Sequence, residues 1–158
     1  MKVQFLLNIL LSTVWVFLTG TINASNFTFG FILSFLVLWL ISSHQNNRKY
    51  FVIIPRVISF TFYFLYELIK ANLQVAADVV TPKFYMEPGI IKFPLDAKTD
   101  LEITLLANVI TLTPGTLSLD VSNDRKVLYI HAMYVHDREE FINSIKNGFE
   151  KRILKIVR

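Results

Sequence analysis

The stretch NVITLTPGTLSLDV, residues 108–121, decides how the second half of the chain folds. It opens with an apolar run of helical period and closes with alternating apolar and polar residues, as in a half-buried strand. Between these parts, Pro114 cannot extend a helix and Gly115 can adopt a positive φ. Thr113 and Thr116 can bond the backbone groups that a helix end leaves free. The stretch therefore predicts a helix-to-strand corner, and local physics accounts for it without catalysis.

The elements on either side of this corner predict a small α+β domain over residues 86–158. The run GIIKFP is a short strand, and Thr99 with Glu102 forms a capping box that starts the helix before the corner. After the corner, LSLDVS and KVLYIHAMYV are strands joined by the turn NDRK. The order is βαββα, which predicts a three-stranded sheet with helices on one face. A domain of about 70 residues has a marginal core, so its open face is expected to be covered by membrane or by another subunit.

The final helix of this domain is expected to start at Asp137, which forms a second cap pair with Glu140. Basic residues near its C-terminal end complement the helix dipole. Its apolar residues are expected to lie roughly along one face, and they are Ile142, Ile145, Phe149 and Leu154.

Residues 1–50 predict a transmembrane helical hairpin. No Asp, Glu, Lys or Arg occurs between Lys2 and Arg48, and this window holds the apolar runs VQFLLNILLSTVWVFLTG and FTFGFILSFLVLWLISS. Each run is close to the ~20 residues that span a bilayer. Basic residues flank the hairpin but not its loop, so both ends are expected in the cytoplasm. A cleaved signal peptide is the alternative for the first run, but Ile22 and Ala24 make a poor cleavage site.

Residues 51–85 predict an amphipathic helix, with one polar stripe beside a wide apolar face rich in Phe. Such a helix can lie in the membrane surface, or it can cross the membrane with its stripe turned to a partner. The charge rule favours the interfacial reading, since a third span would carry the C-terminal domain outside. Glu67 and Lys70 are either a solvated helix pair or contacts to a partner subunit. The stripe consists of Arg56, Ser59, Tyr63, Glu67, Lys70, Gln74 and Asp78.

Composition excludes several classes of function. The chain has no Cys, which removes disulfides, thiolate catalysis and zinc–thiolate sites. Its net charge of +4 comes almost wholly from the N-terminal half, which argues against nucleic-acid binding. With 53% hydrophobic residues and a mean hydropathy of +0.47, it is too apolar for a typical soluble protein. The sequence holds no phosphate-loop or metal-ligand motif, so no cofactor, metal or catalytic residue is expected.

Asp120 and His131 lie on opposite strands of the predicted hairpin and could be imagined as an acid–base pair. A turn over residues 123–126 pairs Asp120 with about position 129, however, so His131 lies further out. No nucleophile accompanies the two, and a structural or interface role is expected for both.

The two apolar runs contain no ionisable residue of the kind that ion translocation needs. Their notable polar residues are Asn8, Ser12 and Thr13, which are expected to form hydrogen bonds between helices of a complex. The hairpin could not carry charge across a bilayer by itself.

The run ITLTPGTLSLDVSNDRKVLYIHAM closely resembles the most distinctive segment of the small E-type subunits of the Mrp/Mnh-type multisubunit cation/proton antiporters. The apolar hairpin, the amphipathic helix and the chain length agree with this family as well. The resemblance implies a small accessory subunit of a seven-subunit assembly that exchanges cytoplasmic Na⁺ or another monovalent cation for external H⁺. It implies the other subunits and the lipid bilayer as partners, with the ion paths in the large subunits. The residues that carry the motif are Thr113, Pro114, Gly115, Thr116, Asp120, Tyr129 and His131.

Two other classes of function stay open from the residues alone. One is a membrane-anchored enzyme that uses Asp120 and His131. The other is a regulatory module whose cytoplasmic domain binds a small ligand.

Overall fold

The computed structural model describes residues 2–42, 49–81 and 86–158. The chain forms two compact units, Met1–Pro55 and Arg56–Arg158. The boundary between them falls at a proline inside a long helix, α3 (Lys49–Val80). Arg48, part of the predicted basic flank, and the predicted domain limit at residue 85 lie outside the described residues.

The first unit is built around a helical hairpin of α1 (Lys2–Thr19) and α2 (Ala24–Ser42). Gly20 ends α1 with a φ of 67°, and Asn23 caps α2 by accepting a hydrogen bond from the Asn26 amide at 2.7 Å. The side chains of Trp15 and Asn26 join the helices through a 3.0 Å hydrogen bond. The helices lie close together at Gly30, where a Cβ atom would meet the Trp15 ring.

In the part of the chain that the structure describes, two helices are long and apolar enough to cross a membrane, judged by length and composition. They are Ala24–Ile41 within α2 and Tyr50–Val80 within α3, whereas Val3–Thr19 of α1 is a shorter apolar helix. The chain thus combines a membrane helical part with a small α+β domain.

The polar residues of α1 bond differently from one another. Asn8 donates its side-chain amide to the Tyr50 hydroxyl at 3.2 Å, and so joins α1 to the start of α3. Ser12 and Thr13 donate instead to carbonyls of their own helix. Asn8 therefore bonds between helices of this chain, whereas the short hydroxyls of Ser12 and Thr13 reach the carbonyl four residues back. Hydrogen bonds from these residues to helices of a complex stay a prediction.

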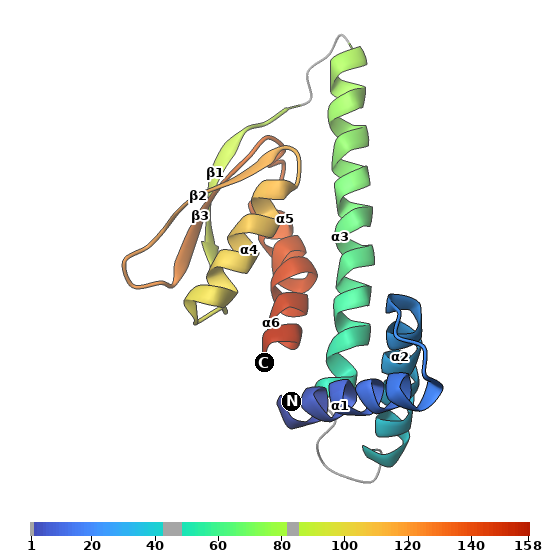
Figure 1. Cartoon of the computed structure of the whole chain (residues 1–158). Helices are drawn as coiled ribbons and strands as arrows, with labels where there is room; N and C mark the ends of the chain where they lie inside the picture. The colour runs from blue at the N-terminus through green and yellow to red at the C-terminus, as the bar shows by residue number, and fades with distance from the viewer. Residues whose placement is uncertain (1, 43–48, 82–85) are drawn as a thin grey trace. The chain divides into compact units, whose positions relative to one another are not determined.

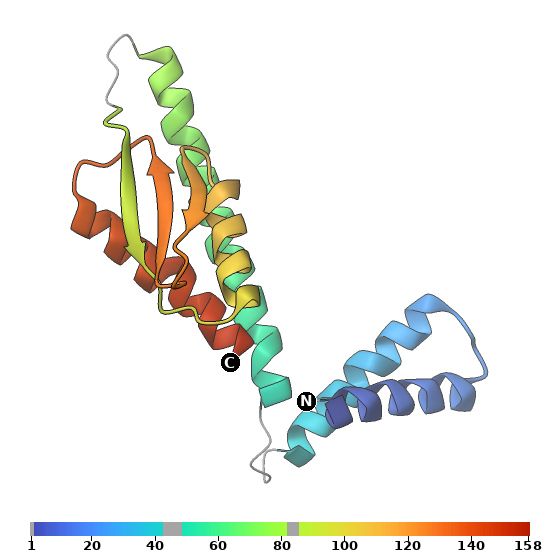
Figure 2. The same cartoon turned by 90° about the vertical axis from the view of Figure 1, so that its left-hand side faces the viewer.

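The second unit contains an antiparallel sheet of β1 (Gly89–Pro94), β2 (Thr116–Val121) and β3 (Val127–Ala132), in the order β1-β3-β2. The connection from β1 through α4 (Asp100–Leu112) therefore leads to the far edge, and the hairpin returns β3 to the centre. Figure 2 shows the sheet in front with the helices behind it. The predicted order of elements and the single helical layer are confirmed.

The core of the second unit lies between the sheet and its helices. The alternation along β3 places Leu128, Ile130 and Ala132 inward and fully buried. Phe93 of β1 and Leu106 of α4 meet them with no exposed surface. Thr99 starts α4 with the predicted capping box, so local capping and burial fix the position of this helix against the sheet.

The final helical segment departs from regular geometry. It consists of α5 (Arg138–Ile145), a π turn η1 (Lys146–Glu150) and α6 (Lys151–Val157). Asp137 caps it as predicted. The buried apolar residues are Ile145, Phe149 and Ile153, so the prediction of Leu154 for this face was wrong. A π turn holds more residues than an α turn, so residues four apart, such as Ile145, Phe149 and Ile153, stay on the same face of this segment.

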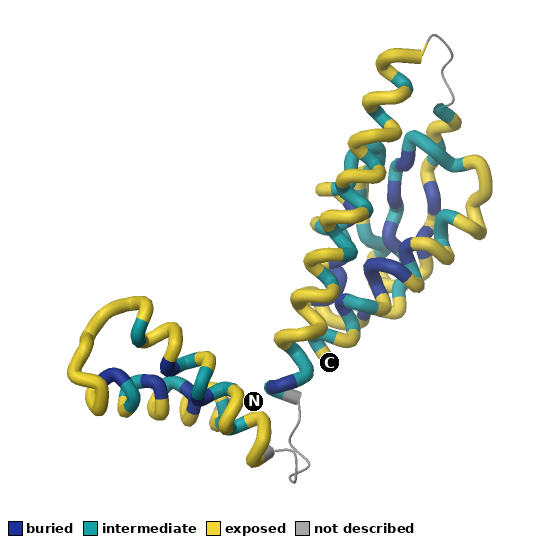
Figure 3. Tube along the Cα trace, turned by 90° about the vertical axis from the view of Figure 1, so that its right-hand side faces the viewer, coloured by how far each residue is buried: buried dark blue, intermediate teal, exposed yellow. Residues whose placement is uncertain are grey.

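Helix α3 runs beside the α+β domain from residue 56 onward (Figure 1). Phe60, Tyr63 and Phe64 pack against the core. The opposite side stays exposed over its length, as the yellow segments of α3 in Figure 3 show. The polar stripe and part of the Phe-rich face thus turn to the domain. The exposed large apolar residues of α3 in this unit are Val57, Ile58, Phe62, Leu65, Tyr66, Ile69, Leu73, Val79 and Val80.

Candidate functional site: the cavity between α3 and the helix-to-strand corner

The corner after α4 has the predicted conformation. Gly115 adopts a φ of 85°. The Thr116 hydroxyl donates to the Ile110 carbonyl at 2.6 Å, and the Thr113 hydroxyl donates to the Val109 carbonyl at 3.1 Å. These bonds satisfy carbonyls that a helix end leaves without partners. The corner is therefore fixed by its own hydroxyls.

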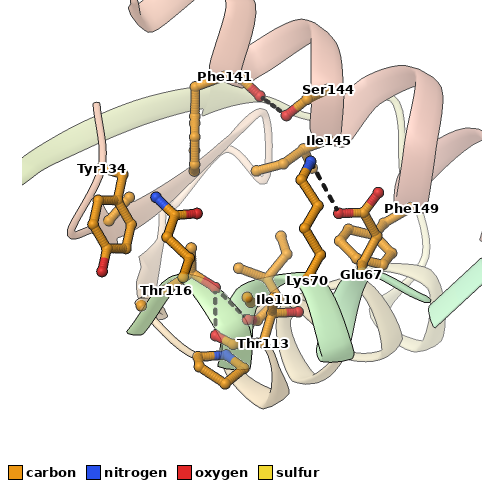
Figure 4. Close-up of a pocket in the computed structure, with 15 residues that line it drawn as sticks. Glu67, Lys70, Ile110, Thr113, Thr116, Tyr134, Phe141, Ser144, Ile145 and Phe149 are labelled. Carbon is orange, nitrogen blue, oxygen red and sulfur yellow. Dashed lines mark hydrogen bonds and ion pairs between the residues drawn. The ribbon is translucent and has the colours of Figure 1, made fainter. Parts of the chain in front are cut away.

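A cavity of about 210 Å³ separates this corner from α3. Figure 4 shows α5 side chains on one side of it and the corner threonines on the other. The predicted partner contacts, Glu67 and Lys70, line the cavity together with the Thr113–Thr116 run. Sequence reasoning treated these two sets separately, because only the tertiary packing of α3 brings them together. The remaining lining residues are Ala71, Gln74, Ile110, Ala132, Tyr134, Phe141, Ser144, Ile145 and Phe149.

Glu67 and Lys70 form a long ion pair at the cavity, with 3.9 Å between the Lys70 ammonium and a Glu67 carboxylate oxygen. The Lys70 side chain is 63% exposed and that of Glu67 is 24% exposed. A pair of this geometry contributes only about 0.2–0.5 kcal/mol to a helix. It leaves the ammonium at the rim, free to meet a group from outside.

The far end of α3 is fastened by Asp78, whose carboxylate accepts a hydrogen bond from the Tyr134 hydroxyl. This bond, together with burial and the Asp78 charge, raises the pKa of Tyr134 to about 12. The sequence placed Asp78 on the polar stripe but gave no sign of this partner, which follows β3 in the chain.

The middle of α3 is held against the domain by the stacked ring of Tyr63. The Arg152 guanidinium lies 4.2 Å from the centre of the Tyr63 ring, and the same ring meets Phe149 edge-on at 5.4 Å. Gly148 permits this approach, because a Cβ atom there would overlap the Tyr63 hydroxyl. The cavity thus lies between two attachment points of α3.

Two buried carboxylates stabilise the base of the domain. Glu102, whose side chain is 3% exposed, accepts from the Lys98 amide at 2.8 Å and from the Arg158 guanidinium at 2.9 Å. The Arg158 hydrogen bond is the main cause that lowers the pKa of Glu102 to about 2. Glu150 accepts from the amides of Asp96 and Ala97 at 2.7 and 3.0 Å.

The sequence pattern missed the burial of Glu150. On a regular helix its side chain would lie ~140° around the axis from Ile145 and would face solvent. The π turn brings it inward instead. No signal in residue spacing marks that turn.

Asp120, Tyr129 and His131 lie away from the cavity, on the sheet face opposite the helices. Asp120 pairs with Tyr129 across the strands, as predicted, and His131 pairs with Leu117. A bulge between Ser118 and Asp120 interrupts this ladder. The acid and the imidazole are therefore not register partners. Exposed Ile90, Leu117 and Leu119 share the two outer strands of the sheet.

The chemistry of the site is that of a contact surface. Within residues 2–42, 49–81 and 86–158, no group of three or more His, Asp or Glu side chains is placed to hold a metal ion. The cavity joins one ion pair, several hydroxyls and an apolar wall. Such a mixture suits the binding of a side chain or a small amphipathic group.

Comparisons with known proteins agree on one family. The family model for a Na⁺/H⁺ ion antiporter subunit matches residues 8–156. The chain is 40% identical to the E1-type Na⁺/H⁺ antiporter subunit of Staphylococcus haemolyticus over 99% of this chain and 98% of that protein. It is 38% identical to the protein of the same name from Staphylococcus aureus strain JH9, with the same coverage.

Two solved structures are similar as well. A chain of the Mrp complex from Dietzia sp. is 29% identical, with a TM-score of 0.50 over 65% of this chain and 96% of that chain. A chain of the membrane-bound sulfane sulfur reductase, an archaeal respiratory membrane complex, is 29% identical with a TM-score of 0.55, over 95% of this chain and 96% of that one. Because the family model and these relatives span nearly the whole sequence, the chain belongs to the family of Na⁺/H⁺ ion antiporter subunits.

Proposed function

We propose that the chain is an accessory, assembly-supporting subunit of a multisubunit antiporter that exchanges cytoplasmic Na⁺, or another monovalent cation, for external H⁺. Its relatives are named as antiporter subunits, and one similar structure is a chain of an Mrp complex. Its partners are the other subunits of a seven-subunit assembly and the lipid bilayer. It is a component of a transporter rather than an enzyme.

The observation that carries the accessory role is the distribution of charge in the helices. An ion path through a membrane needs ionisable side chains that face water. Residues 3–42 contain no Asp, Glu, Lys, Arg or His. In α3, Glu67 pairs with Lys70, and Asp78 binds Tyr134 of the domain. Both acidic groups of α3 thus have partners within the second unit, and the ion path belongs to other subunits.

The proposed place of α3 is the cytoplasmic membrane surface. Its charged groups and three aromatic residues face the α+β domain, while the opposite side is apolar and exposed. An amphipathic helix buries such a side in the boundary between headgroups and acyl chains. The basic flanks of the hairpin favour a cytoplasmic position for the domain.

The motif residues divide between two roles in this proposal. Thr113, Pro114, Gly115 and Thr116 are structural, because they hold the corner that shapes the cavity. Asp120, Tyr129 and His131, on the open sheet face, contribute to an interface. Glu67 and Lys70 present a charged rim to a partner subunit.

Co-purification tests the assembly role. The chain is expressed with a tagged large antiporter subunit, and capture of the tag should retain it together with the other subunits. Deletion of the chain should lower the yield of intact complex, while exchange by the complexes that remain assembled stays measurable. Normal assembly without the chain would contradict an assembly role.

Reporter fusions test the membrane topology. A reporter fused after Arg158 should behave as cytoplasmic, and one inserted near Asn23 should behave as external. An external C-terminus would contradict the two-span arrangement. An external N-terminus with a cytoplasmic C-terminus would favour three spans instead.

A further inference from the structure

A basic depression lies at the opposite end of the domain from Tyr134, and it shares no lining residue with the cavity described above. It is open, has a volume of about 590 Å³, and is formed by α3, η1 and α6. Its side chains include five cations and two carboxylates, so they carry a net positive charge. The lining residues are Arg56, Asp96, Lys146, Asn147, Glu150, Lys151, Leu154, Lys155 and Arg158.

Both carboxylates of the depression form ion pairs with the same lysine, Lys146. Lys146 lies 2.7 Å from Asp96 and 3.4 Å from Glu150, and Glu150 also accepts two backbone amides. Across the described residues, no carboxylate lies within ion-pair distance of Arg56, Lys151 or Lys155. Three cations therefore face the depression without compensating charge.

Arg56 is held in place at the edge of this depression. One of its guanidinium nitrogens donates to the Lys155 carbonyl. A guanidinium has five N–H donors in a rigid fork, which suits the planar recognition of phosphate oxygens. The bond to α6 therefore orients the fork and leaves most of its donors for an anion.

Stabilisation of the helix dipole does not explain the whole cluster. A cation in the last turn of a helix interacts favourably with its C-terminus, and Lys155 fits that role. Lys151 is the first residue of α6, however, and Arg56 belongs to a different helix. Their convergence on one depression needs another reason.

The surface beside Arg56 identifies the kind of anion. Val57 and Ile58 follow it on α3 and are 41% and 51% exposed. Exposed aliphatic groups next to unpaired cations match a phospholipid, which has an anionic phosphate beside acyl chains. We propose that Arg56, Lys151 and Lys155 bind the headgroup phosphate of an anionic phospholipid, with the exposed apolar side of α3 against its acyl chains. This inference rests on the position of α3 at the membrane surface proposed above.

The electrostatic strength of such a site is measurable. A basic residue near an anionic membrane surface strengthens binding about fivefold, and the effect is screened by salt. Removal of three cations should therefore weaken binding roughly 100-fold at low ionic strength. Zwitterionic phosphatidylcholine should bind much less tightly than phosphatidylglycerol.

Native mass spectrometry of the full chain in a neutral detergent, titrated with phosphatidylglycerol or phosphatidylcholine, tests the proposal. The site variant is Arg56→Gln/Lys151→Gln/Lys155→Gln. The control variant, Lys92→Gln/Lys126→Gln/Arg138→Gln, removes the same charge from exposed residues outside the depression. We expect the wild type and the control to retain phosphatidylglycerol, and the site variant to lose it.

Each other outcome would overturn the proposal. Equal losses in both variants would mean that bulk charge alone attracts the lipid. Displacement of the lipid by millimolar inorganic phosphate would assign the depression to soluble anions. A site variant that keeps the lipid but no longer co-purifies with the large subunit would assign it to an acidic protein segment. Because the lipid is measured on the isolated chain, failure of the assembly role would appear separately, in co-purification.

Discussion

Gly115 holds the helix-to-strand corner in a backbone conformation that other residues resist. Its φ of 85° lies in the region that glycine enters without steric penalty. A Cβ atom at this position would also lie 3.3 Å from the Tyr134 ring. This residue was predictable from the sequence, because a Pro-Gly pair between a helical and an alternating pattern leaves few backbone solutions. Its contact with Tyr134 was not, since that contact depends on the position of the chain after β3.

Gly115→Val should lower the yield of assembled complex. The β-branched residue resists a positive φ, at a cost of about 1–3 kcal/mol, and a small domain has little stability in reserve. Gly115→Asn tolerates the left-handed region better and should do less harm. Complex yield and exchange per assembled complex are measured together. An unchanged yield with no exchange would show that the corner acts in transport and is not merely structural.

Glu102 should make the domain sensitive to acid. Its pKa is lowered to about 2, so its contribution to stability is complete above the ordinary value near 4.3 and disappears as the pH falls toward 2. Glu102→Gln should reduce the free energy of unfolding by about 1–3 kcal/mol at neutral pH, because the charged hydrogen bonds from Arg158 are weakened.

Thermal unfolding of the full chain between pH 2 and pH 7 measures this effect. The difference between the wild type and Glu102→Gln should shrink across the acid range. Glu139→Gln, at an exposed position in the first turn of α5, is the control and should follow the wild-type profile. A constant difference at all pH values would contradict the role of the Glu102 charge.

At the scale of elements, most of the fold could be predicted. The features that the sequence did not predict depend on packing between segments far apart in the chain. Capping residues and alternation fixed α4 and the three strands, because those signals are local. The π turn in the last helix and the side of α3 that meets the domain depend on packing between distant segments. Leu154 was misplaced, and the burial of Glu150 was not predicted, for the first reason. The meeting of Glu67 with the corner was missed for the second.

The attachment of α3 should depend on the absence of a side chain at Gly148. Alanine favours a helix over glycine by about 1 kcal/mol, so Gly148→Ala would stabilise a free helix. Here its Cβ atom would overlap the Tyr63 hydroxyl, so the part of α3 around Tyr63 should separate from the domain more often. Since the chain has no Cys, an introduced Ala71→Cys in the cavity wall is a unique label.

Adding Gly148→Ala should raise the rate of maleimide labelling at Ala71→Cys roughly several-fold, because local separation of α3 from the domain exposes the thiol. Gly89→Ala is the matched control, since its Cβ atom would make only an ordinary contact with Val135 at 3.6 Å. The same labelling rate in both variants would mean that Tyr63 does not hold α3 against the domain.

At the scale of the whole molecule, the apolar N-terminal helices and the α+β domain with its buried core belong to different units of the chain. The N-terminal helices are apolar and without ionisable residues over 3–42, whereas the buried charged side chains of the described residues, Glu102 and Glu150, belong to the α+β domain. A subunit built in this way can lie in the membrane by its apolar helices while the α+β domain keeps a fixed shape. Under the proposed function the ion path belongs to other subunits, so charges on the open sheet face are not expected to take part in it.

Replacing Asp120 with Asn and His131 with Gln in the same chain should therefore leave ion exchange per assembled complex largely intact. The two residues are not register partners, since Asp120 pairs with Tyr129 and His131 with Leu117. Asn can still accept the 2.8 Å hydrogen bond that the Val121 amide donates to Asp120, so the bulge should persist. Exchange in vesicles, normalised to the amount of intact complex, measures the effect, and a fall in yield alone would indicate an interface. Complete loss of exchange in a normally assembled complex would show that this face takes part in transport, because neither folding nor assembly could then account for the loss.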